Sequence, residues 1–514
     1  MIQTNFSNLQ VLWIFLALLS GLTSVIFFLN KKQGISLCFL VIAGVILRIL
    51  AAGLDPFLWT WDEQYHALVA KNMLTDPAKP VLISNPLLDY DFHNWKGNHI
   101  WLHKQPWFFW QIAVFFKLFG VNEFVLRLPT AIMMTLMILI IYKIGKLVSN
   151  TEIAWYGAFI YTFSYYFINF ISGSTFTDHN DSAFIFYVSL SIWSYLEYIH
   201  SKRKRWLILI GIFSGIAILN KWLVGFLVYS GWILNVFLGY SKNERSDELR
   251  KLAFSLAWTL IVALPWQLFV WFSYPLEGRY EFNGQHFFQA VEGHNEDQWY
   301  HFQLFGEQYG GVIAILIILP GLICFFKSIR KKRYQIPLVT YLIVTYLFFT
   351  LAATKMPMFC TIVSPVLFLG LGAISDKGVQ KLREYIPAGI SFWIIVLLLG
   401  CLAFAMLDIN QIDVQHSDKN TYWKLKKIDA IIDRQVSHKL PSDDWVVFNC
   451  GEHNTVMVMF YSGATAYGHY PDSVQYGMLK SKGIGMATFS DEHIPIYLKL
   501  DPSVIKIYLK PLSY

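Results

Sequence analysis

The sequence predicts a polytopic α-helical membrane protein with a small C-terminal soluble α/β domain. The chain has 514 residues, of which 55% are hydrophobic and only 15% are charged, whereas soluble domains are about 25% charged. Apolar runs of spanning length recur along most of the chain, and residues 408–514 change to charged residues between short apolar strands. These observations predict a membrane domain followed by an α/β domain.

The apolar runs predict about twelve transmembrane helices, since a spanning helix needs roughly 20 mostly apolar residues. The predicted helices lie near residues 11–29, 35–54, 125–142, 153–172, 182–199, 206–219, 222–239, 252–272, 309–326, 335–353, 358–375 and 387–407. The apolar stretch 107–119 is too short to cross, so we expect a re-entrant or interfacial helix there.

The positions of Lys and Arg predict the orientation, because basic residues in short loops favour the cytoplasmic side. The basic loops are residues 31–32, 143–146, 202–205, 242–251, 327–333 and 377–383. They recur after every second predicted span if residues 107–119 do not cross. The other loops, the N-terminus and the tail then face outward. The net charge of +7 therefore reflects topology, and we expect no nucleic-acid partner.

This alternation predicts two domains. Residues 1–407 form the transmembrane domain with outer loops 55–106 and 273–308, and residues 408–514 form the extracytoplasmic α/β domain. Strands are expected at residues 445–449 and 504–508. The five cysteines show no CxxC spacing and predict no disulfide framework.

Two adjacent acids, Asp62 and Glu63, stand in the first outer loop, at the start of a predicted amphipathic helix. Carboxylates at a membrane surface are costly to desolvate unless they have a role or partners. A carboxylate shielded from water can act as a general base toward an acceptor hydroxyl or amine. The alternative is a helix N-terminus with two solvated acids.

The same loop ends in His103-Lys104-Gln105-Pro106, just before the short apolar helix. A lysine at a helix start is well placed to bind a phosphate, because its charge acts together with exposed backbone N–H groups. The alternative for Lys104 is an interfacial side chain that reaches toward water. His103 is either a metal ligand or an interfacial imidazole.

Acids and lysines occur on most of the other outer turns as well. Asp178 and Asp181 begin one span, Lys221 lies at a two-residue turn, and Lys355 lies at another. The long loop 273–308 adds several carboxylates together with His286, His294 and His301, and it is long enough to act as a lid. A divalent metal such as Zn²⁺ or Mn²⁺ would suit His103, His286 or His294 with a carboxylate, although no HExxH spacing supports a metal site.

Several motifs in order resemble the aminoarabinose transferase and protein O-mannosyltransferase group of GT-C glycosyltransferases. The resemblance covers about residues 40–370. It rests on Trp61-Asp62-Glu63-Gln64-Tyr65, Lys104-Gln105-Pro106-Trp107, residues 117–129, 215–221 and 263–266, and Lys355-Met356-Pro357. Each motif is common alone, and their order and spacing carry the resemblance.

The resemblance implies an enzyme that takes a sugar from a polyprenyl-phosphate carrier on the outer face of the membrane. By position, the residues that match the family's site fall into four groups. These are the catalytic acids Asp62 and Glu63, the donor-phosphate contacts Lys104, Lys355 and Lys221, the cavity residues Tyr65, Asp178, Asp181 and His294, and His103 and His286 as possible metal ligands, since some relatives hold a metal there.

Three features depart from the family's pattern. Gln105 replaces the first of two prolines after the lysine, and Phe359 replaces a tyrosine two residues past the proline of the KxP motif. The second change removes a hydroxyl contact to the donor. An additional N-terminal span also precedes the loop that carries Asp62.

We therefore expect an inverting glycosyltransferase with Asp62 as base and a lipid, glycan or protein acceptor, with lipid A modification and protein mannosylation as its models. We expect it in the bacterial inner membrane, in contact with membrane lipids, with its active site and C-terminal domain on the periplasmic side. The alternative is a secondary transporter that uses Asp62, Asp181 and Lys221 as intramembrane coupling charges. A scaffold that presents the C-terminal domain is a further alternative, but it gives the outer acids and lysines no role.

Overall fold

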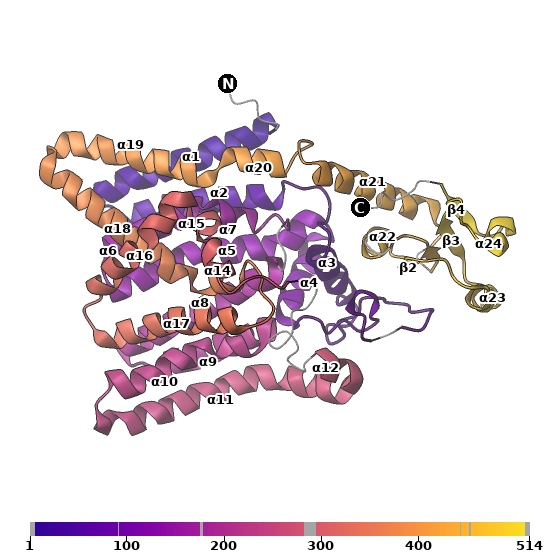
Figure 1. Cartoon of the computed structure of the whole chain (residues 1–514), viewed down its shortest axis with the longest axis horizontal. Coiled ribbons are helices and arrows are strands. Elements are labelled where there is room, and N and C mark those ends of the chain that lie inside the picture. Colours follow the sequence, from indigo (N-terminus) through magenta and orange to yellow (C-terminus); the bar gives the residue numbers. More distant parts are fainter. Residues whose placement is uncertain are drawn as a thin grey trace. The chain divides into compact units, whose positions relative to one another are not determined.

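A computed structural model of the chain describes residues 6–90, 92–174, 178–281, 294–442, 444–451 and 454–508, and Figure 1 traces its helices and strands. The chain divides into two compact units. The first, residues 1–52 and 128–413, is named here the membrane unit. The second, residues 53–127 and 414–514, is named the α/β unit, and it joins the first predicted outer loop to the predicted C-terminal domain.

Each of the twelve predicted runs coincides with a helix of the structure. These helices are α1 (Asn8–Leu29), α2 (Gln33–Ala52), α5 (Glu123–Val148), α6 (Thr151–Phe163), α8 (Asp178–Ser201), α9 (Lys204–Lys221), α10 (Leu227–Gly239), α11 (Lys242–Ser273), α16 (Gly311–Ser328), α17 (Lys332–Leu351), α18 (Ser364–Tyr385) and α19 (Ala388–Leu407). Shorter elements between them are α7 (Tyr165–Asn169), η2 (Trp222–Phe226), α12 (Pro275–Glu281), α14 (Tyr300–Gln303), α15 (Phe305–Tyr309), η3 (Phe359–Val363) and α20 (Ile409–Gln415).

Within the described ranges, nine helical stretches are long and apolar enough to cross a membrane. One of them, Lys204–Gly239, contains both α9 and α10. Between these two helices lies η2, which begins with Trp222 at a φ of +56°. The predicted runs that are not among the nine belong to α6, which has only 13 residues, and to α8, which carries polar residues at its start. The fold class expected from the sequence is therefore confirmed.

Helices of the membrane unit approach each other closely at glycines. A Cβ atom at Gly372 of α18 would lie 2.5 Å from the carbonyl oxygen of Ile153 on α6. A Cβ atom at Gly157 of α6 would lie 2.9 Å from the carbonyl oxygen of Phe368. Because only glycine leaves room there, the two backbones touch, which is the packing expected of helices in lipid.

The basic loops gather at one end of the membrane unit. Ser149, after α5, lies 2.6 Å from Ser328 at the end of α16, and Arg333 donates to the carbonyl of Gly239 at 2.9 Å. At the opposite end of α8 and α9, Asp181 pairs with Lys221. The charged groups expected to carry chemistry in this unit are thus separated from the basic loops by the length of the helices.

The α/β unit contains a four-stranded parallel sheet in the order β2-β1-β3-β4. Its strands are β1 (Val446–Phe448), β2 (Thr465–Ala466), β3 (Met486–Phe489) and β4 (Ile505–Ile507). Its helices are α3 (Asp62–Asn72), η1 (Trp95–Gly97), α4 (Trp107–Phe119), α21 (Thr421–Lys439), α22 (Thr455–Ser462), α23 (Ser473–Ser481) and α24 (Ile496–Leu500). The two strands predicted from the sequence are β1 and β4.

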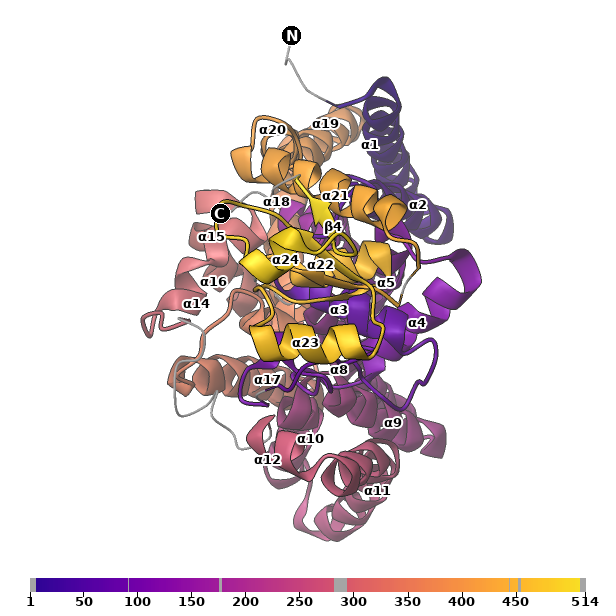
Figure 2. The ribbon, with the colours of Figure 1, turned by 90° about the vertical axis from the view of Figure 1, so that its right-hand side faces the viewer.

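The first loop is built into this α/β fold. Leu88 is buried in the same apolar core as Val446 and Phe448 of β1. The Tyr467 hydroxyl accepts hydrogen bonds from the backbone N–H groups of Leu87 and Leu88, both at 3.0 Å. In addition, α22 packs against α3 (Figure 2). The helix that begins with Asp62 therefore rests on the C-terminal part of the chain.

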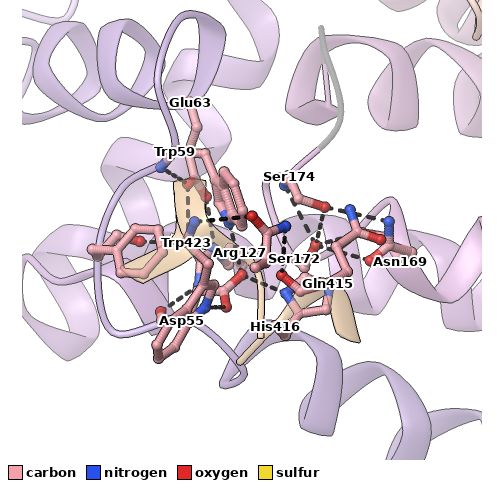
Figure 3. A network of polar contacts seen from close by, with 12 residues as sticks. Asp55, Trp59, Glu63, Arg127, Asn169, Ser172, Ser174, Gln415, His416 and Trp423 are labelled. Atoms are coloured by element: carbon pink, nitrogen blue, oxygen red, sulfur yellow. Dashed lines mark hydrogen bonds and ion pairs between the residues drawn. The ribbon is translucent and has the colours of Figure 1, made fainter. Parts of the chain in front are cut away.

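A buried ion pair fixes the start of α3 (Figure 3). Arg127 donates to both carboxylate oxygens of Glu63, at 2.6 and 3.0 Å, and both side chains are fully buried. The same guanidinium donates to the backbone carbonyls of Asp55 and Phe57, each at 2.8 Å. The backbone N–H of Trp59 also donates to the Glu63 carboxylate, at 2.7 Å.

The carboxylate of Asp55 connects this site to the C-terminal segment (Figure 3). It accepts the indole N–H of Trp423 at 2.6 Å and that of Trp59 at 2.7 Å, and it lies 2.8 Å from Nδ1 of His416. Burial acts to raise the pKa of Asp55, but His416, Arg127 and Trp423 outweigh it and hold that pKa below its ordinary value. Asp55 is therefore a buried anion.

Arg127→Ala should destabilise the protein strongly, because it leaves the Glu63 carboxylate buried without its cation. Removing one partner of a buried ion pair costs about 3–5 kcal/mol. Thermal unfolding of purified protein in detergent measures the loss, with Lys377→Ala at an exposed position as control. Equal unfolding midpoints for the two variants would contradict this role of Arg127.

The contribution of Asp55 should depend on pH. Its folded-state pKa is depressed, so its stabilisation is present above the unfolded pKa of about 3.9 and is lost as the pH falls through the folded value. The difference in unfolding midpoint between the wild type and Asp55→Asn should therefore be largest near neutral pH and should shrink in acid. A difference that stays constant with pH would show that the charge of Asp55 contributes nothing.

Candidate active site

Asp62 opens α3 directly after a strained residue. Trp61 has a φ of +73°, in a region that non-glycine residues rarely occupy. The next residue, Asp62, lies in the first turn of α3, where the helix dipole favours a negative charge. Strain of this kind persists only where the surrounding structure holds it, and it is frequent at functional sites.

Asp62 and Lys104, two site candidates chosen from the sequence, lie close together in the structure. The Lys104 ammonium lies 3.5 Å from the Asp62 carboxylate, and the two side chains are 15% and 12% exposed. Nε2 of His66, one turn along α3, lies 3.9 Å from the same carboxylate, and that ring is fully buried. Asp62 therefore combines a shielded position with remaining access to solvent, which a reactive carboxylate needs.

Lys104 lies shortly before α4, the 13-residue helix Trp107–Phe119. This is the short apolar helix predicted from the sequence, and it packs against α3. Gln105, which replaces a proline of the family pattern, is buried. The contact between α3 and α4 thus places Lys104 beside Asp62.

Glu63 has a different role from the catalytic one predicted for it. Its side chain is fully buried against Arg127, and it also accepts the Trp59 N–H. A carboxylate held by these donors has no access to an acceptor. In the structure Glu63 is a positioning residue that fixes the helix start on which Asp62 stands.

Tyr65 and His103 belong to one aromatic cluster in the α/β unit. The ring of Tyr65 stacks on Trp101, with centroids 5.6 Å apart, and its hydroxyl lies 3.5 Å from the carbonyl of Lys96. The ring of His103 stacks on Trp95, with centroids 4.6 Å apart. Tyr65 is only 2% exposed, so it packs within this cluster, whereas a cavity position was expected.

The described residues do not support a metal site. They contain no group of three or more His, Cys, Asp or Glu side chains arranged to hold an ion. His103 is engaged with aromatic rings, and His286 lies outside the described residues. No step of the mechanism proposed below uses a metal.

In the membrane unit, Asp181 and Lys221 form an ion pair. Asp181 lies near the start of α8 and Lys221 at the end of α9, so a predicted cavity residue and a predicted phosphate contact meet at one end of a helix pair. The Lys221 ammonium also lies over the ring of Phe359, 4.3 Å from its centroid. The backbone of Asp178 begins α8, but its side chain lies outside what the structure describes.

Lys355 lies close to His294 and His301 in the same unit. Its backbone N–H donates to the carbonyl of His294 at 3.2 Å, and its ammonium donates to the carbonyl of Ala352 at 2.9 Å. The side chain is buried. The bond to a neutral carbonyl leaves the ammonium able to attract an anion.

His301 of α14 was not among the candidates chosen from the sequence. It is 1% exposed, and neither ring nitrogen has a hydrogen-bond partner among the described residues. Burial and the nearby Lys355 lower the pKa of His301 to about 4, so the ring is neutral at pH 7. Its ring stacks on Phe359 with centroids 6.3 Å apart. Nothing in the sequence separated this histidine from the others of loop 273–308.

Together, the membrane helices, the acid beside a lysine at the start of α3, and the α/β unit define the class of polytopic membrane proteins with the GT-C glycosyltransferase fold. Residues 103–271 match the family described as dolichyl-phosphate-mannose-protein mannosyltransferase. The resemblance seen in the sequence is therefore confirmed.

An uncharacterized protein of Aquifex aeolicus is 24% identical over 359 residues, which are 68% of this chain and 65% of that protein. The undecaprenyl phosphate-alpha-4-amino-4-deoxy-L-arabinose arabinosyl transferase of Pseudomonas savastanoi pv. phaseolicola is 24% identical over 363 residues, 67% of this chain and 61% of the relative. The chain thus spans less than two thirds of the length of each of these relatives.

The crystal structure of ArnT from Cupriavidus metallidurans bound to undecaprenyl phosphate has the same fold. It superposes with a TM-score of 0.63 and 15% sequence identity, and the match covers 87% of each chain. The shared architecture thus extends over most of the chain.

His301→Phe should preserve or raise thermal stability, because an apolar ring of similar size removes two buried nitrogens without partners. An unsatisfied buried polar group costs about 1–3 kcal/mol. Unfolding midpoints in detergent measure the change, and His438→Phe at an exposed position serves as control. A marked fall in the midpoint of His301→Phe alone would mean that the imidazole makes a stabilising hydrogen bond.

Proposed function

We propose that this protein transfers a sugar from a polyprenyl-phosphate carrier to an acceptor at the outer face of the membrane. The observation that carries the proposal is the pairing of Asp62 with Lys104 at the strained start of α3. A shielded carboxylate beside a cation suits a reaction in which a proton is removed from the acceptor and negative charge develops on a phosphate. The similarity to an undecaprenyl-phosphate-dependent arabinosyl transferase supports this donor class.

The proposed reaction is a single displacement that inverts the anomeric carbon. An acceptor hydroxyl or amine attacks the anomeric carbon, its proton passes to the Asp62 carboxylate, and the bond between that carbon and the phosphate oxygen breaks. Polyprenyl phosphate leaves with the electron pair of the broken bond. Lys104 stabilises this leaving group, and its move from Asp62 toward the phosphate makes the carboxylate more basic.

Within the membrane unit, Lys355 and Lys221 are proposed to contact donor phosphate, as the sequence predicts. Lys355 is buried, and its ammonium donates to the neutral carbonyl of Ala352. Lys221 is balanced by Asp181, so its proposed role is to shape the cavity as well as to attract the donor. His301 offers a neutral N–H donor beside Phe359, where the family pattern has a tyrosine hydroxyl.

The proposed location is the bacterial inner membrane, with Asp62 on the periplasmic side. The separation of the basic loops from Asp181 and Lys221 along the helices supports this orientation. The same separation favours the enzyme over a transporter, because a transporter's coupling charges lie near the midplane. The proposed acceptor is a lipid, a glycan or a protein.

Asp62→Asn should abolish transfer while the protein stays folded and inserted in the membrane, because an amide cannot accept the acceptor's proton at neutral pH. The measurement is the passage of radiolabelled sugar from carrier lipid to acceptor in membrane vesicles. Asp76→Asn is the matched control, since Asp76 is a surface acid of the same unit whose carboxylate lies 3.4 Å from the ammonium of exposed Lys79. Normal turnover by Asp62→Asn would refute the assignment.

Lys104→Met should lower kcat/KM for the donor by roughly two orders of magnitude, the loss found when one charge-stabilising donor is removed from a transition state. Donor concentration is varied in the same vesicle assay. Lys79→Met, which changes an exposed lysine of the same unit, should leave donor use unchanged. If Lys104→Met changed KM for the acceptor alone, Lys104 would contact the acceptor, and its proposed role in binding the donor phosphate would be refuted.

A further inference from the structure

The α/β unit contains a cleft, lined by polar and apolar side chains, that the mechanism above does not use. Its volume is about 530 Å³, within the range of small-molecule sites. It lies between the segment 83–99 of the first loop and the C-terminal part of the unit. Among its lining residues are Asp89, Asn94, His99, Thr455, Tyr467 and His469.

The frame of the cleft is held by defined contacts. An isolated antiparallel bridge between Val81 and Ile100 closes the base of the loop segment. Thr465 of β2 donates to the carbonyl of Asn85 at 3.0 Å, and Tyr467 holds the next turn of the loop through its hydroxyl. These contacts hold the loop segment against the sheet, so both sides of the cleft are fixed.

The position of the cleft relative to the parallel sheet also favours a binding site. Tyr467, Gly468 and His469 directly follow β2, and Thr455 begins α22, which leads from β1 to β2. In parallel α/β sheets, ligands bind outside the carboxyl ends of the strands. The cleft lies at this edge.

The chemistry of the lining suits hydroxyl groups. Asp89 accepts hydrogen bonds, Asn94 both donates and accepts, and an imidazole such as His99 does both when it is neutral, which matches hydroxyls that are donors and acceptors at once. Burial lowers the pKa of His99 against the opposing effect of Asp89. Tyr90 adds an aromatic face, with its ring 4.0 Å from that of His99.

The charges of the lining balance, since Lys96 also borders the cleft and offsets Asp89. Lys96 further connects the cleft to the catalytic segment. Its ammonium lies over the ring of Trp61, 4.7 Å from the centroid, and Trp61 immediately precedes Asp62. A ligand in the cleft is therefore bordered by a residue that touches the segment carrying the proposed base.

We propose that this cleft binds the carbohydrate portion of the acceptor, as a neutral, hydroxyl-rich glycan. The role of this glycan as acceptor rests on the proposed function, whereas glycan binding at the cleft does not. In this arrangement the C-terminal part of the chain selects the acceptor, and the first loop carries the base that acts on it.

Binding is tested with full-length protein in phospholipid nanodiscs, which avoid sugar-based detergents. Saturation-transfer NMR is recorded with maltotriose and chitotriose as neutral probes and with glucose 6-phosphate as a charged one. We expect saturation of at least one neutral probe, lost in the double variant Tyr90→Ala with His469→Ala. The matched control is Tyr385→Ala with His493→Ala, which changes two exposed residues outside the cleft. Unchanged unfolding midpoints show that the variants are folded.

Three NMR results would overturn the proposal. The first is no saturation of either neutral probe, and the second is saturation of glucose 6-phosphate alone. The third is equal saturation of a neutral probe by the wild type and by the cleft variant. In the vesicle assay the cleft variant should raise KM for the acceptor at least about tenfold, equivalent to 1.4 kcal/mol, and leave KM for the donor unchanged. Absence of transfer by the wild type would refute the proposed function, while the NMR result would still decide whether the cleft binds sugar.

Discussion

The buried ion pair between Glu63 and Arg127 is the interaction on which the α/β unit depends. Arg127 lies in the first turns of α5 and binds both the carboxylate of Glu63 and the backbone carbonyls of the loop before α3. Burying two charges is costly unless their hydrogen-bonding capacity is met, and here a guanidinium satisfies four acceptors. The direction in which α3 begins follows from this pair, and so does the position of Asp62.

Asp62 and Glu63 are neighbours in the sequence and yet differ in environment. The second is fully enclosed and neutralised by a bidentate partner. The first is partly exposed, with Lys104 and His66 at longer distances. Two carboxylates on adjacent helical positions point to different sides of a helix, so one stabilises the structure while the other remains able to react.

Much of the membrane fold was predictable, because long apolar runs and the placement of basic residues follow directly from the cost of polar groups in lipid. Asp62 and Lys104 were both site candidates from the sequence, but their approach was not predicted, because it depends on the contact between α3 and α4. The role of Glu63 was not predicted either, since its partner is 64 positions away and neither Arg127 nor Asp55 carries a local signal. His301 was missed because the absence of a hydrogen-bond partner is a property of the folded packing. His286 and the side chain of Asp178 stay predictions.

The two segments of the α/β unit, residues 53–127 and 414–514, are far apart in the sequence, which has a consequence for biogenesis. The first segment contains Leu88, whose core is completed only by β1, β3 and neighbouring helices of the second. Synthesis proceeds at about 5–20 residues per second, so the first segment waits roughly 15–60 s for its partner. During that interval Leu88 and the aromatic residues around it lack their native cover. The nascent chain thus passes through a stage at which chaperones or proteases of its compartment can recognise an incomplete loop.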